Sequence, residues 1–292
     1  MNIKDLFVKK KAVVSFEIFP PKATSPIEKI YDTLEALRGL MPDYISITYG
    51  AGGSVISNRT VELASLVKNK YKIEPLAHLT AIHSSKEDIL HLLNELKEKN
   101  INNILALRGD IKEGHPVSKD FRYASDLVKF ILQNGNFNIS GACYPEGHFE
   151  SANLDKDLDF LKKKVDSGVT HLNTQLFFDN QDFYCFLEKA RKKGINVPIQ
   201  AGIMPIVKKK QIENIVFLSG VKLPSKFSKL ITKYGHDDEM MRAAGVEYAT
   251  EQIIDLLKNN VQGIHLYIMN NAQLAKDIIK NISHLLEGIN RE

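Results

Sequence analysis

The chain has 292 residues, 43% of them hydrophobic and 25% charged, and its formal net charge is +4. This balance is typical of a folded globular protein and argues against disorder, and the length is close to the roughly 250 residues of a β/α barrel. Basic residues form only short runs, at 162–164 and 208–210, so no concentrated surface for nucleic acid is expected. Cys143 and Cys185 lie far apart in sequence, which indicates neither a disulfide framework nor a metal-binding pair.

The start of the chain, residues 1–11, is short and charged and lacks the apolar core of a signal peptide. No later stretch has the roughly 18 uninterrupted apolar residues that a membrane-spanning helix needs. We therefore expect a cytoplasmic protein with no membrane partner, and the isolated cysteines fit a reducing compartment.

Eight short runs rich in β-branched residues recur along the chain, and each is followed by a longer segment with helical periodicity. Apolar residues spaced by three and four, as at Ile27, Ile30 and Leu34, predict amphipathic helices in these segments. Because parallel strands need a long crossover that is usually helical, the alternation predicts a parallel sheet. The predicted strands are residues 13–19, 44–48, 74–80, 103–107, 138–144, 171–175, 198–201 and 263–267.

Eight such repeats predict closure into a (β/α)8 TIM barrel, an α/β fold, with an open doubly wound sheet as the alternative. Ser85, followed by Asp88, resembles a capping box and predicts a helix start. The connection between the seventh and eighth strands is much longer than the others, with about three helical pieces between Lys208 and Asn259. We predict that these pieces form an insertion in one βα loop and that residues 1–292 make up a single catalytic domain.

Residues able to carry chemistry stand at the carboxyl ends of the predicted strands. In a barrel these ends meet at one mouth, where the βα loops build the active site. We therefore expect the side chains of these residues to face a common pocket. They are Glu17, Thr48 with Tyr49, His78, residues 108–110, Tyr144 with His148, Gln175 and Tyr267.

Glu17 interrupts an otherwise apolar strand, where an unpaired carboxylate would be costly. Burial favours the neutral, protonated carboxyl, and that state suits a general acid. The alternative is a structural carboxylate paired with an arginine or lysine inside the barrel.

Residues 108–110, Arg-Gly-Asp, combine a bidentate donor, a position for close backbone approach and an anionic acceptor. This combination would suit a polar ring edge or a phosphate, and the alternative is a tight turn with an exposed salt bridge. Residues 50–53, Gly-Ala-Gly-Gly, follow the second strand and lack the GxGxxG spacing, so a Rossmann dinucleotide site is not expected.

Three histidines, His78, His148 and His265, could gather on one face of the barrel. Their spacing is not that of a zinc motif such as HExxH. We expect polar or ring-stacking roles for them and no bound metal.

Together these strand-end motifs resemble the methylenetetrahydrofolate reductase family, and they occur in the family's order over residues 13–285. The resemblance implies a barrel that binds FAD without a Rossmann domain. It also implies a ping-pong reaction in which NADH or NADPH reduces the flavin and 5,10-methylenetetrahydrofolate then receives the hydride, giving 5-methyltetrahydrofolate for methionine synthesis. The matching segments are residues 15–21, 46–51, 78–80, 106–110, 123–127, 144–148, 164–168, 174–179 and 202–205.

The resemblance assigns roles residue by residue. It makes Glu17 the acid that protonates the folate bridge nitrogen. It places Asp110 near the flavin and the pterin, where a negative charge makes the flavin a better hydride donor and stabilises the cationic iminium of the folate. The implied substrate contacts are Gln175, Gln211, Tyr267 and Asn271. The implied FAD contacts are Thr48, Tyr49, Ala51, His78, Arg108, Gly109, Asp110, Tyr123, Ala124, Tyr144, His148, Asp157 and Lys164.

Two positions depart from the family pattern. Asn271 stands where the family usually has an arginine that meets the folate glutamate, and the lysines at 208–210 could supply a substitute charge. The phenylalanine that covers the substrate aligns with Ile215, or with Phe217 in a shifted register. The chain ends without the regulatory domain of larger relatives, so feedback by adenosylmethionine is not expected.

A flavoprotein barrel of the proline dehydrogenase type and a non-catalytic flavin- or folate-binding subunit of a corrinoid or redox complex are the alternative functions. The choice between NADH and NADPH is undecided. A homo-oligomer is expected because bacterial relatives associate.

Overall fold

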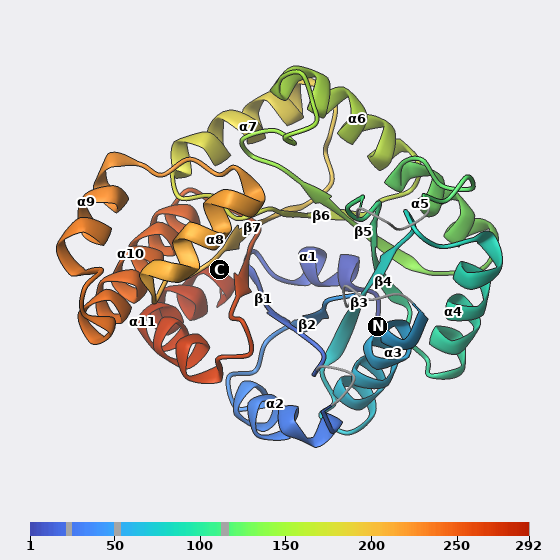
Figure 1. Ribbon diagram of the computed structural model, residues 1–292, viewed down its shortest axis with the longest axis horizontal. Coiled ribbons are helices and arrows are strands. Elements are labelled where there is room, and N and C mark those ends of the chain that lie inside the picture. Colours follow the sequence, from blue (N-terminus) through green and yellow to red (C-terminus); the bar gives the residue numbers. More distant parts are fainter. Residues whose placement is uncertain (22–24, 50–53, 112–116, 292) are drawn as a thin grey trace.

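Eight parallel strands close into a barrel in sequence order, with β8 pairing to β1 (Figure 1). The computed structural model describes residues 1–21, 25–49, 54–111 and 117–291, without the side chains of residues 54–58, 214, 217 and 218. Closure of the sheet confirms the TIM barrel and excludes the open doubly wound alternative. The strands are β1 (Val13–Ile18), β2 (Tyr44–Ile47), β3 (Glu74–Thr80), β4 (Asn103–Leu107), β5 (Asn138–Cys143), β6 (His171–Thr174), β7 (Ile199–Ile203) and β8 (Gly263–Tyr267).

The predicted strands are right in number and differ from the observed ones by one or two residues at some ends. Phe19, Thr48, Tyr144 and Gln175 lie just past their strands. The seventh strand was predicted from residue 198, but Pro198 has no backbone N–H to offer a neighbour, and β7 begins one residue later and runs on to Ile203.

Amphipathic helices surround the barrel (Figure 1). The capping box predicted at Ser85 is present, because its hydroxyl accepts from the Asp88 N–H and the Asp88 carboxylate accepts from the Ser85 N–H. The helices before β7 are η1 (Ile3–Asp5), α1 (Leu6–Lys9), η2 (Ile27–Ile30), α2 (Tyr31–Arg38), α3 (Ser54–Asn69), α4 (Lys86–Glu98), α5 (Ala124–Gln133), α6 (Leu154–Asp166) and α7 (Asn180–Lys192).

The long connection after β7 contains three helices, as predicted: α8 (Lys209–Ser219), α9 (Ser225–Tyr234) and α10 (Asp238–Lys258). The last helix, α11 (Ala272–Arg291), follows β8. A separate apolar cluster, which includes Phe178, Ile206 and Phe227, lies beneath α8 and α9. In α10, a Cβ at Gly245 would lie 1.7 Å from the carbonyl oxygen of Ile206, so only glycine permits this approach of helix to loop.

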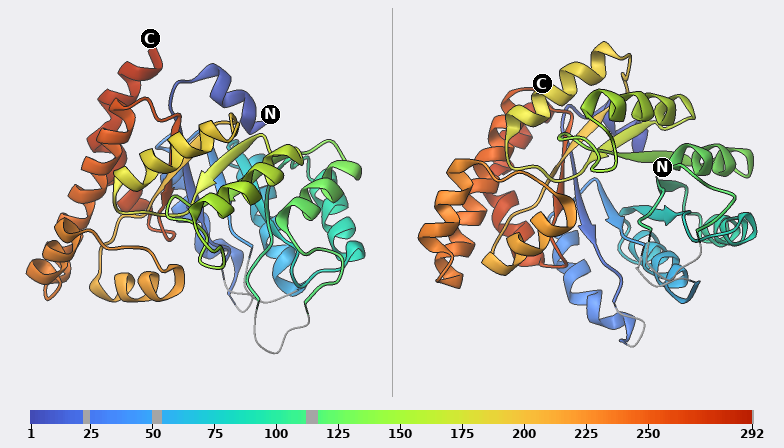
Figure 2. Two further views of the ribbon diagram at one scale, coloured as in Figure 1. Left: turned by 90° about the horizontal axis from the view of Figure 1, so that it is seen from above. Right: turned by 45° about the horizontal axis from the view of Figure 1, so that its top comes forward.

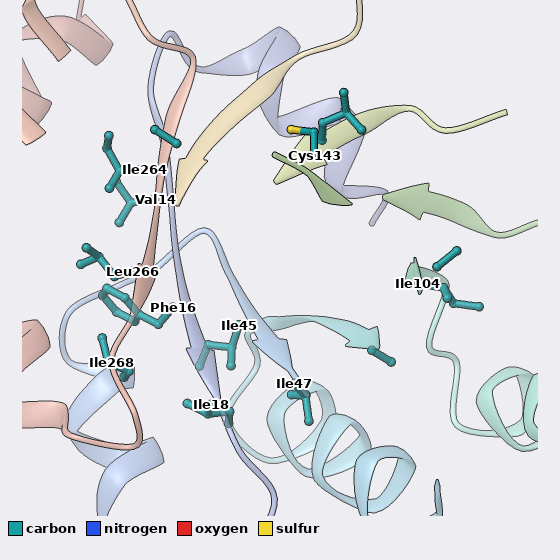
Figure 3. Close-up of a cluster of buried hydrophobic side chains, with 14 of the residues drawn as sticks. Val14, Phe16, Ile18, Ile45, Ile47, Ile104, Cys143, Ile264, Leu266 and Ile268 are labelled. Carbon is teal, nitrogen blue, oxygen red and sulfur yellow. The ribbon is translucent and has the colours of Figure 1, made fainter. Parts of the chain in front are cut away.

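Alternation along the strands divides the barrel into an apolar layer under the helices and an interior with both polar side chains and a small apolar cluster, which includes Val13, Leu76 and Leu105. Val14, Phe16 and Ile18 of β1 lie beside Ile264 and Leu266 of β8 in the layer under the helices (Figure 3). The residues between them in β1, Ser15 and Glu17, therefore point into the barrel. Interiors of such barrels are usually filled by branched apolar side chains. Here the strands also bury a polar set: Ser15, Glu17, Ser46, His78, Ser140, His171, Asn173, Gln200 and His265.

The N-terminal segment closes the end of the barrel where the strands begin. The backbone N–H of Ile3 donates to Asn103 Oδ1 over 2.9 Å, and that of Lys4 donates to Asn138 Oδ1 over 3.1 Å. The Phe7 ring contacts the ring of His171, with 5.4 Å between the centroids. In side view α1 lies at one end of the barrel, and α8 and α9 lie at the other (Figure 2). The open mouth is therefore at the carboxyl ends of the strands.

None of the helices in the described ranges is both long enough and apolar enough to span a membrane.

Candidate active site

Glu17 lies at the mouth of the barrel between two histidines on other strands. Its Oε2 is 3.4 Å from Nε2 of His265 on β8 and 3.6 Å from Nε2 of His78 on β3. Only 9% of the residue is exposed. No lysine or arginine among the described residues pairs with it, so its surroundings do not resemble the structural ion pair that was the alternative.

Both histidines are held by serine hydroxyls from neighbouring strands. Ser46 Oγ lies 2.6 Å from His78 Nε2, and Ser15 Oγ lies 2.7 Å from His265 Nδ1. Burial lowers the pKa of His78 to about 4, so this ring is neutral near pH 7. A neutral ring leaves the adjacent carboxyl of Glu17 without a compensating positive charge.

The three histidines considered as a metal set do not gather. His148 packs edge-on against Tyr144, with 4.7 Å between the ring centroids, while His78 and His265 face Glu17. Across the described part of the chain, His, Cys, Asp and Glu side chains form no group of three or more arranged to hold a metal.

Arg108 and Gly109 follow β4 directly, and the Arg108 carbonyl accepts from the backbone N–H groups of Ala81 and Ile82. Gly109 has φ of +87°, a left-handed conformation that favours glycine. The guanidinium of Arg108 donates to both carboxylate oxygens of Glu150, over 2.5 and 2.8 Å. The Asp110 carbonyl lies 3.1 Å from His83 Nε2, and its side chain is exposed. This segment therefore presents a cation and an anion at the mouth.

Lys164 on α6 is a buried cation with one described hydrogen bond. Its ammonium donates to the backbone carbonyl of Ala142 over 2.6 Å, and burial lowers the pKa of the amine. Asp157, about two helical turns earlier on α6, is 8% exposed and accepts from the Ser151 hydroxyl over 3.1 Å. An ammonium has three N–H donors, so Lys164 has capacity for a further acceptor.

Two tyrosines at the mouth, Tyr267 and Tyr144, have raised pKa values. Burial raises the pKa of Tyr267, and the neighbouring Glu17 raises it further, as does Tyr144. Burial likewise raises the pKa of Tyr144, with added contributions from Asp157 and Asp110. Glu17 therefore acts electrostatically on Tyr267, and Asp110 acts on Tyr144.

Gly202 permits the position of Tyr267. The phenolic O–H of Tyr267 donates to the Thr174 carbonyl over 2.6 Å. A Cβ at Gly202 would lie 2.3 Å from that carbonyl oxygen and 2.8 Å from the Tyr267 ring. The glycine in β7 is thus required for the tyrosine to cross the mouth.

Other predicted site residues are placed on the same side of the barrel but have backbone partners. Gln175 Oε1 accepts from the N–H of Leu176 over 2.9 Å, and Gln211 Oε1 accepts from that of Val207 over 3.1 Å. Thr48 and Tyr49 follow β2 directly, and Ala51, with residues 50–53, lies outside the described residues. Tyr123 precedes α5, which begins at Ala124, and its exposed ring stacks on Phe160 at 6.1 Å between centroids.

Asn271, the departure from the family arginine, caps a helix. Its Oδ1 accepts from the backbone N–H of Leu274 over 3.0 Å at the start of α11. The preceding residue, Asn270, has a left-handed backbone and exchanges two hydrogen bonds with the backbone of Phe19, over 2.8 and 2.9 Å. The turn after β8 thus holds the segment that follows Glu17, a role that the sequence did not reveal.

Of the two residues proposed to cover a substrate, Ile215 packs partly buried against the apolar cluster beneath α8 and α9, while the side chain of Phe217 lies outside the described part. Lys208, considered as a substitute charge, lies 3.8 Å from Asp238.

Comparison with known proteins decides the family. The family model "Methylenetetrahydrofolate reductase" matches residues 2–283. The chain belongs to this family. A 5,10-methylenetetrahydrofolate reductase of Pectobacterium carotovorum is 33% identical over 90% of this chain and 87% of its own length, and the Escherichia coli protein of the same description is 31% identical over 90% and 88%.

The family also contains longer relatives. "Methylenetetrahydrofolate reductase 1" of Schizosaccharomyces pombe is 34% identical over 96% of this chain, and the chain spans about half the length of such yeast and plant relatives, 47% and 51%. Among solved structures, an uncharacterized Clostridium thermocellum protein described as binding two copies of 5-methyl-5,6,7,8-tetrahydrofolic acid superposes with a TM-score of 0.66 at 14% identity, covering 98% of this chain and 99% of that one. At that identity the likeness supports the fold alone.

Proposed function

We propose that the mouth of this barrel reduces 5,10-methylenetetrahydrofolate to 5-methyltetrahydrofolate, with FAD as cofactor and NADH or NADPH as electron source. The observation that carries the proposal is Glu17, a nearly buried carboxyl beside a neutral His78 in a chain of the methylenetetrahydrofolate reductase family. The reductases of similar length in Pectobacterium and Escherichia support the same activity.

The residues present fit an anionic dinucleotide cofactor. Arg108 and Lys164 are the cations on the β4 and β5 side of the mouth, and both suit a diphosphate or a polar ring edge. Gly109 permits a close approach to the backbone, and the exposed ring of Tyr123 offers a stacking surface. A bound flavin would accept a hydride from the nicotinamide and supply it to the one-carbon bridge of the folate.

Glu17 would supply the proton in this reaction. Protonation of the bridge nitrogen opens the five-membered ring of the folate to an iminium, which is the hydride acceptor. The exposed carboxylate of Asp110, in the segment that follows β4, would favour the cationic iminium.

The substrate contacts follow from the same geometry. Tyr267, held by its hydrogen bond to the Thr174 carbonyl, would form a wall of the pocket next to Glu17. Gln175 and Gln211 would turn their amides from the backbone to the pterin when the substrate binds. Asn271 would contribute a cap to α11 instead of the charge that an arginine gives, so binding of the folate glutamate would be weaker than in relatives with the arginine.

Separate measurement of the two half-reactions tests this proposal. Glu17→Gln keeps the shape of the side chain and removes the acid. It should leave reduction of bound FAD by NADH or NADPH intact and slow reoxidation by methylenetetrahydrofolate about a hundredfold or more, since general acid catalysis contributes about that factor. Glu188→Gln, on the exposed face of α7, is the matched control and should change neither rate.

Two outcomes would contradict the proposal. A colourless protein that does not bind added FAD excludes a flavin reaction. Equal survival of both half-reactions in Glu17→Gln removes the acid role of Glu17.

A further inference from the structure

A chain of buried hydrogen bonds runs through the interior of the barrel and ends on Glu17. Its members come from strands that are not all neighbours: Asn173 on β6, Tyr44 on β2, Gln200 on β7, Ser15 on β1 and His265 on β8. Each member is less than 5% exposed. The distances and the chemistry of each group fix which atom donates at every step.

The orientation of the Gln200 amide is set by its neighbours. Its nitrogen lies 3.2 Å from the Val13 carbonyl oxygen and 3.0 Å from that of Ile264, and only an N–H can face two carbonyls. Its oxygen therefore faces Tyr44, whose hydroxyl donates to it over 2.6 Å. The Tyr44 oxygen in turn accepts from the Asn173 amide over 3.1 Å.

The chain of hydrogen bonds continues from Gln200 through Ser15 and His265 to Glu17. Gln200 Nε2 also lies 3.0 Å from Ser15 Oγ. Because an amide nitrogen does not accept a hydrogen bond, the single hydroxyl hydrogen of Ser15 is directed elsewhere. The shortest contact of that hydroxyl is with His265 Nδ1, at 2.7 Å. It also lies within hydrogen-bonding reach of the Tyr44 hydroxyl, which already donates to Gln200 and accepts from Asn173. If Ser15 donates to Nδ1, the neutral ring carries its hydrogen on Nε2, which is 3.4 Å from Glu17 Oε2.

We propose that Ser15 and Gln200 hold His265 in the Nε2–H tautomer, so that His265 acts as a positioning residue that donates to Oε2 of Glu17. Oε2 is then the carbonyl oxygen of the acid, and the acidic proton resides on Oε1. The donors all point the same way along the chain, and such an alignment strengthens each bond through polarisation by the next. This inference rests on the proposed function, because it explains how the acid is oriented.

A hydrogen bond donated by Ser15 also bears on the charge of the His265 ring. A ring that accepts from Ser15 at Nδ1 is an imidazole and not an imidazolium. His265 therefore donates to Glu17 as a neutral ring. The interior of the barrel thus determines the direction of the carboxyl.

The tautomer is tested directly by NMR of the FAD-bound protein carrying isotopically labelled histidine. The two ring nitrogens of a neutral histidine have distinct chemical shifts, so the protonated one is identified. We expect His265 to be protonated at Nε2 in the wild-type protein. Protonation at Nδ1, or at both nitrogens near neutral pH, would overturn the inference.

The functional consequence is tested with Ser15→Ala and a matched control, Ser140→Ala. Ser140 is equally buried in the barrel, but its hydroxyl lies 3.3 Å from the backbone carbonyl oxygen of His171 and not against a ring nitrogen. Ser15→Ala should slow the folate half-reaction about tenfold, the cost of one well-oriented hydrogen bond, and leave flavin reduction unchanged. Tyr44→Phe, two bonds further from His265, should slow it by a smaller factor of about three.

The controls separate this inference from the proposed function. If Glu17→Gln separates the half-reactions while Ser15→Ala behaves as Ser140→Ala does, the acid role stands and the positioning role is wrong. If Glu17→Gln does not separate them, the proposed function fails, and the NMR result still decides the tautomer.

Discussion

The two ends of the barrel use polar residues in opposite ways. At the closed end, the N-terminal segment binds the asparagine side chains: Asn103 accepts from the Ile3 N–H and donates to the Met1 carbonyl and to Glu74. At the mouth, buried polar atoms retain bonding capacity. Glu146 Oε1 is buried with no partner among the described atoms, and Lys164 donates to one backbone carbonyl. The closed end thus stabilises the fold, and the mouth holds groups for a ligand.

Substitution of Lys164 at the mouth should give the largest effect and tests whether the mouth, in contrast to the closed end, serves ligand binding. Lys164→Met keeps the length of the side chain and removes a charge that burial already penalises, so the free energy of unfolding should change little. Affinity for FAD should fall about tenfold to a hundredfold, because hydrogen bonds from charged donors contribute about 1.5 to 3 kcal/mol. Titration of the apoprotein with FAD, followed by flavin fluorescence, measures the change.

The neighbouring lysine provides the control for that experiment. Lys163 is exposed on the same helix, and Lys163→Met should leave FAD affinity unaltered. Equal affinity in both variants would show that Lys164 serves the fold and not the cofactor.

At the closed end, a substitution should lower the stability of the fold and leave FAD affinity unchanged. Asn103→Ala removes the acceptor of the buried Ile3 N–H and should lower the free energy of unfolding by about 2 kcal/mol, since a buried donor would be left unsatisfied. FAD affinity should be retained. Denaturant unfolding measures the stability, with Asn69→Ala on the exposed end of α3 as a variant expected to lie within about 0.5 kcal/mol of wild type. A loss of FAD affinity without a loss of stability would reverse the comparison.

The barrel itself could be predicted from local patterns. Eight strand-and-helix repeats and the three-helix insertion follow from periodicity, which every segment carries in its own sequence. Glu17 could also be selected, because a charged residue in an apolar strand is conspicuous without any knowledge of its neighbours. The resemblance to the family then supplied roles that spacing alone left open, such as those of Asp110 and Lys164.

The partners of these residues could not be predicted, because they come together only when the barrel closes. Ser15, Gln200 and His265 lie on three strands and are separated by 185 and 250 positions from Ser15. The alternation of β1 does place Ser15 on the same face as Glu17, and this signal could have been used. Glu150 gives no comparable signal, since an exposed glutamate in a loop is ordinary until Arg108 is seen to pair with it.

A histidine of the closed end allows the smallest and most specific test. Burial lowers the pKa of His171 from an ordinary 6.5 to about 3, and its Nε2 is buried without a partner among the described atoms. Below pH 6.5 the unfolded chain gains a proton here that the folded protein gains only near pH 3. Above pH 6.5 the titration of His171 therefore does not affect the free energy of unfolding. As the pH falls from 6.5 towards 3, it lowers this free energy by about 1.4 kcal/mol per pH unit.

His171→Phe keeps a ring against Phe7 and removes the titration. The slope of unfolding free energy against pH between 6 and 4 should fall by about 1.4 kcal/mol per pH unit, whatever the effect of the larger ring on absolute stability. His78, with its pKa of about 4 at the mouth, should continue to contribute to the slope. His91→Gln, on an exposed turn of α4, should leave the slope as it is. An unaltered slope in His171→Phe would mean that the closed end admits water and a proton to His171, so that it is not the sealed end of the barrel.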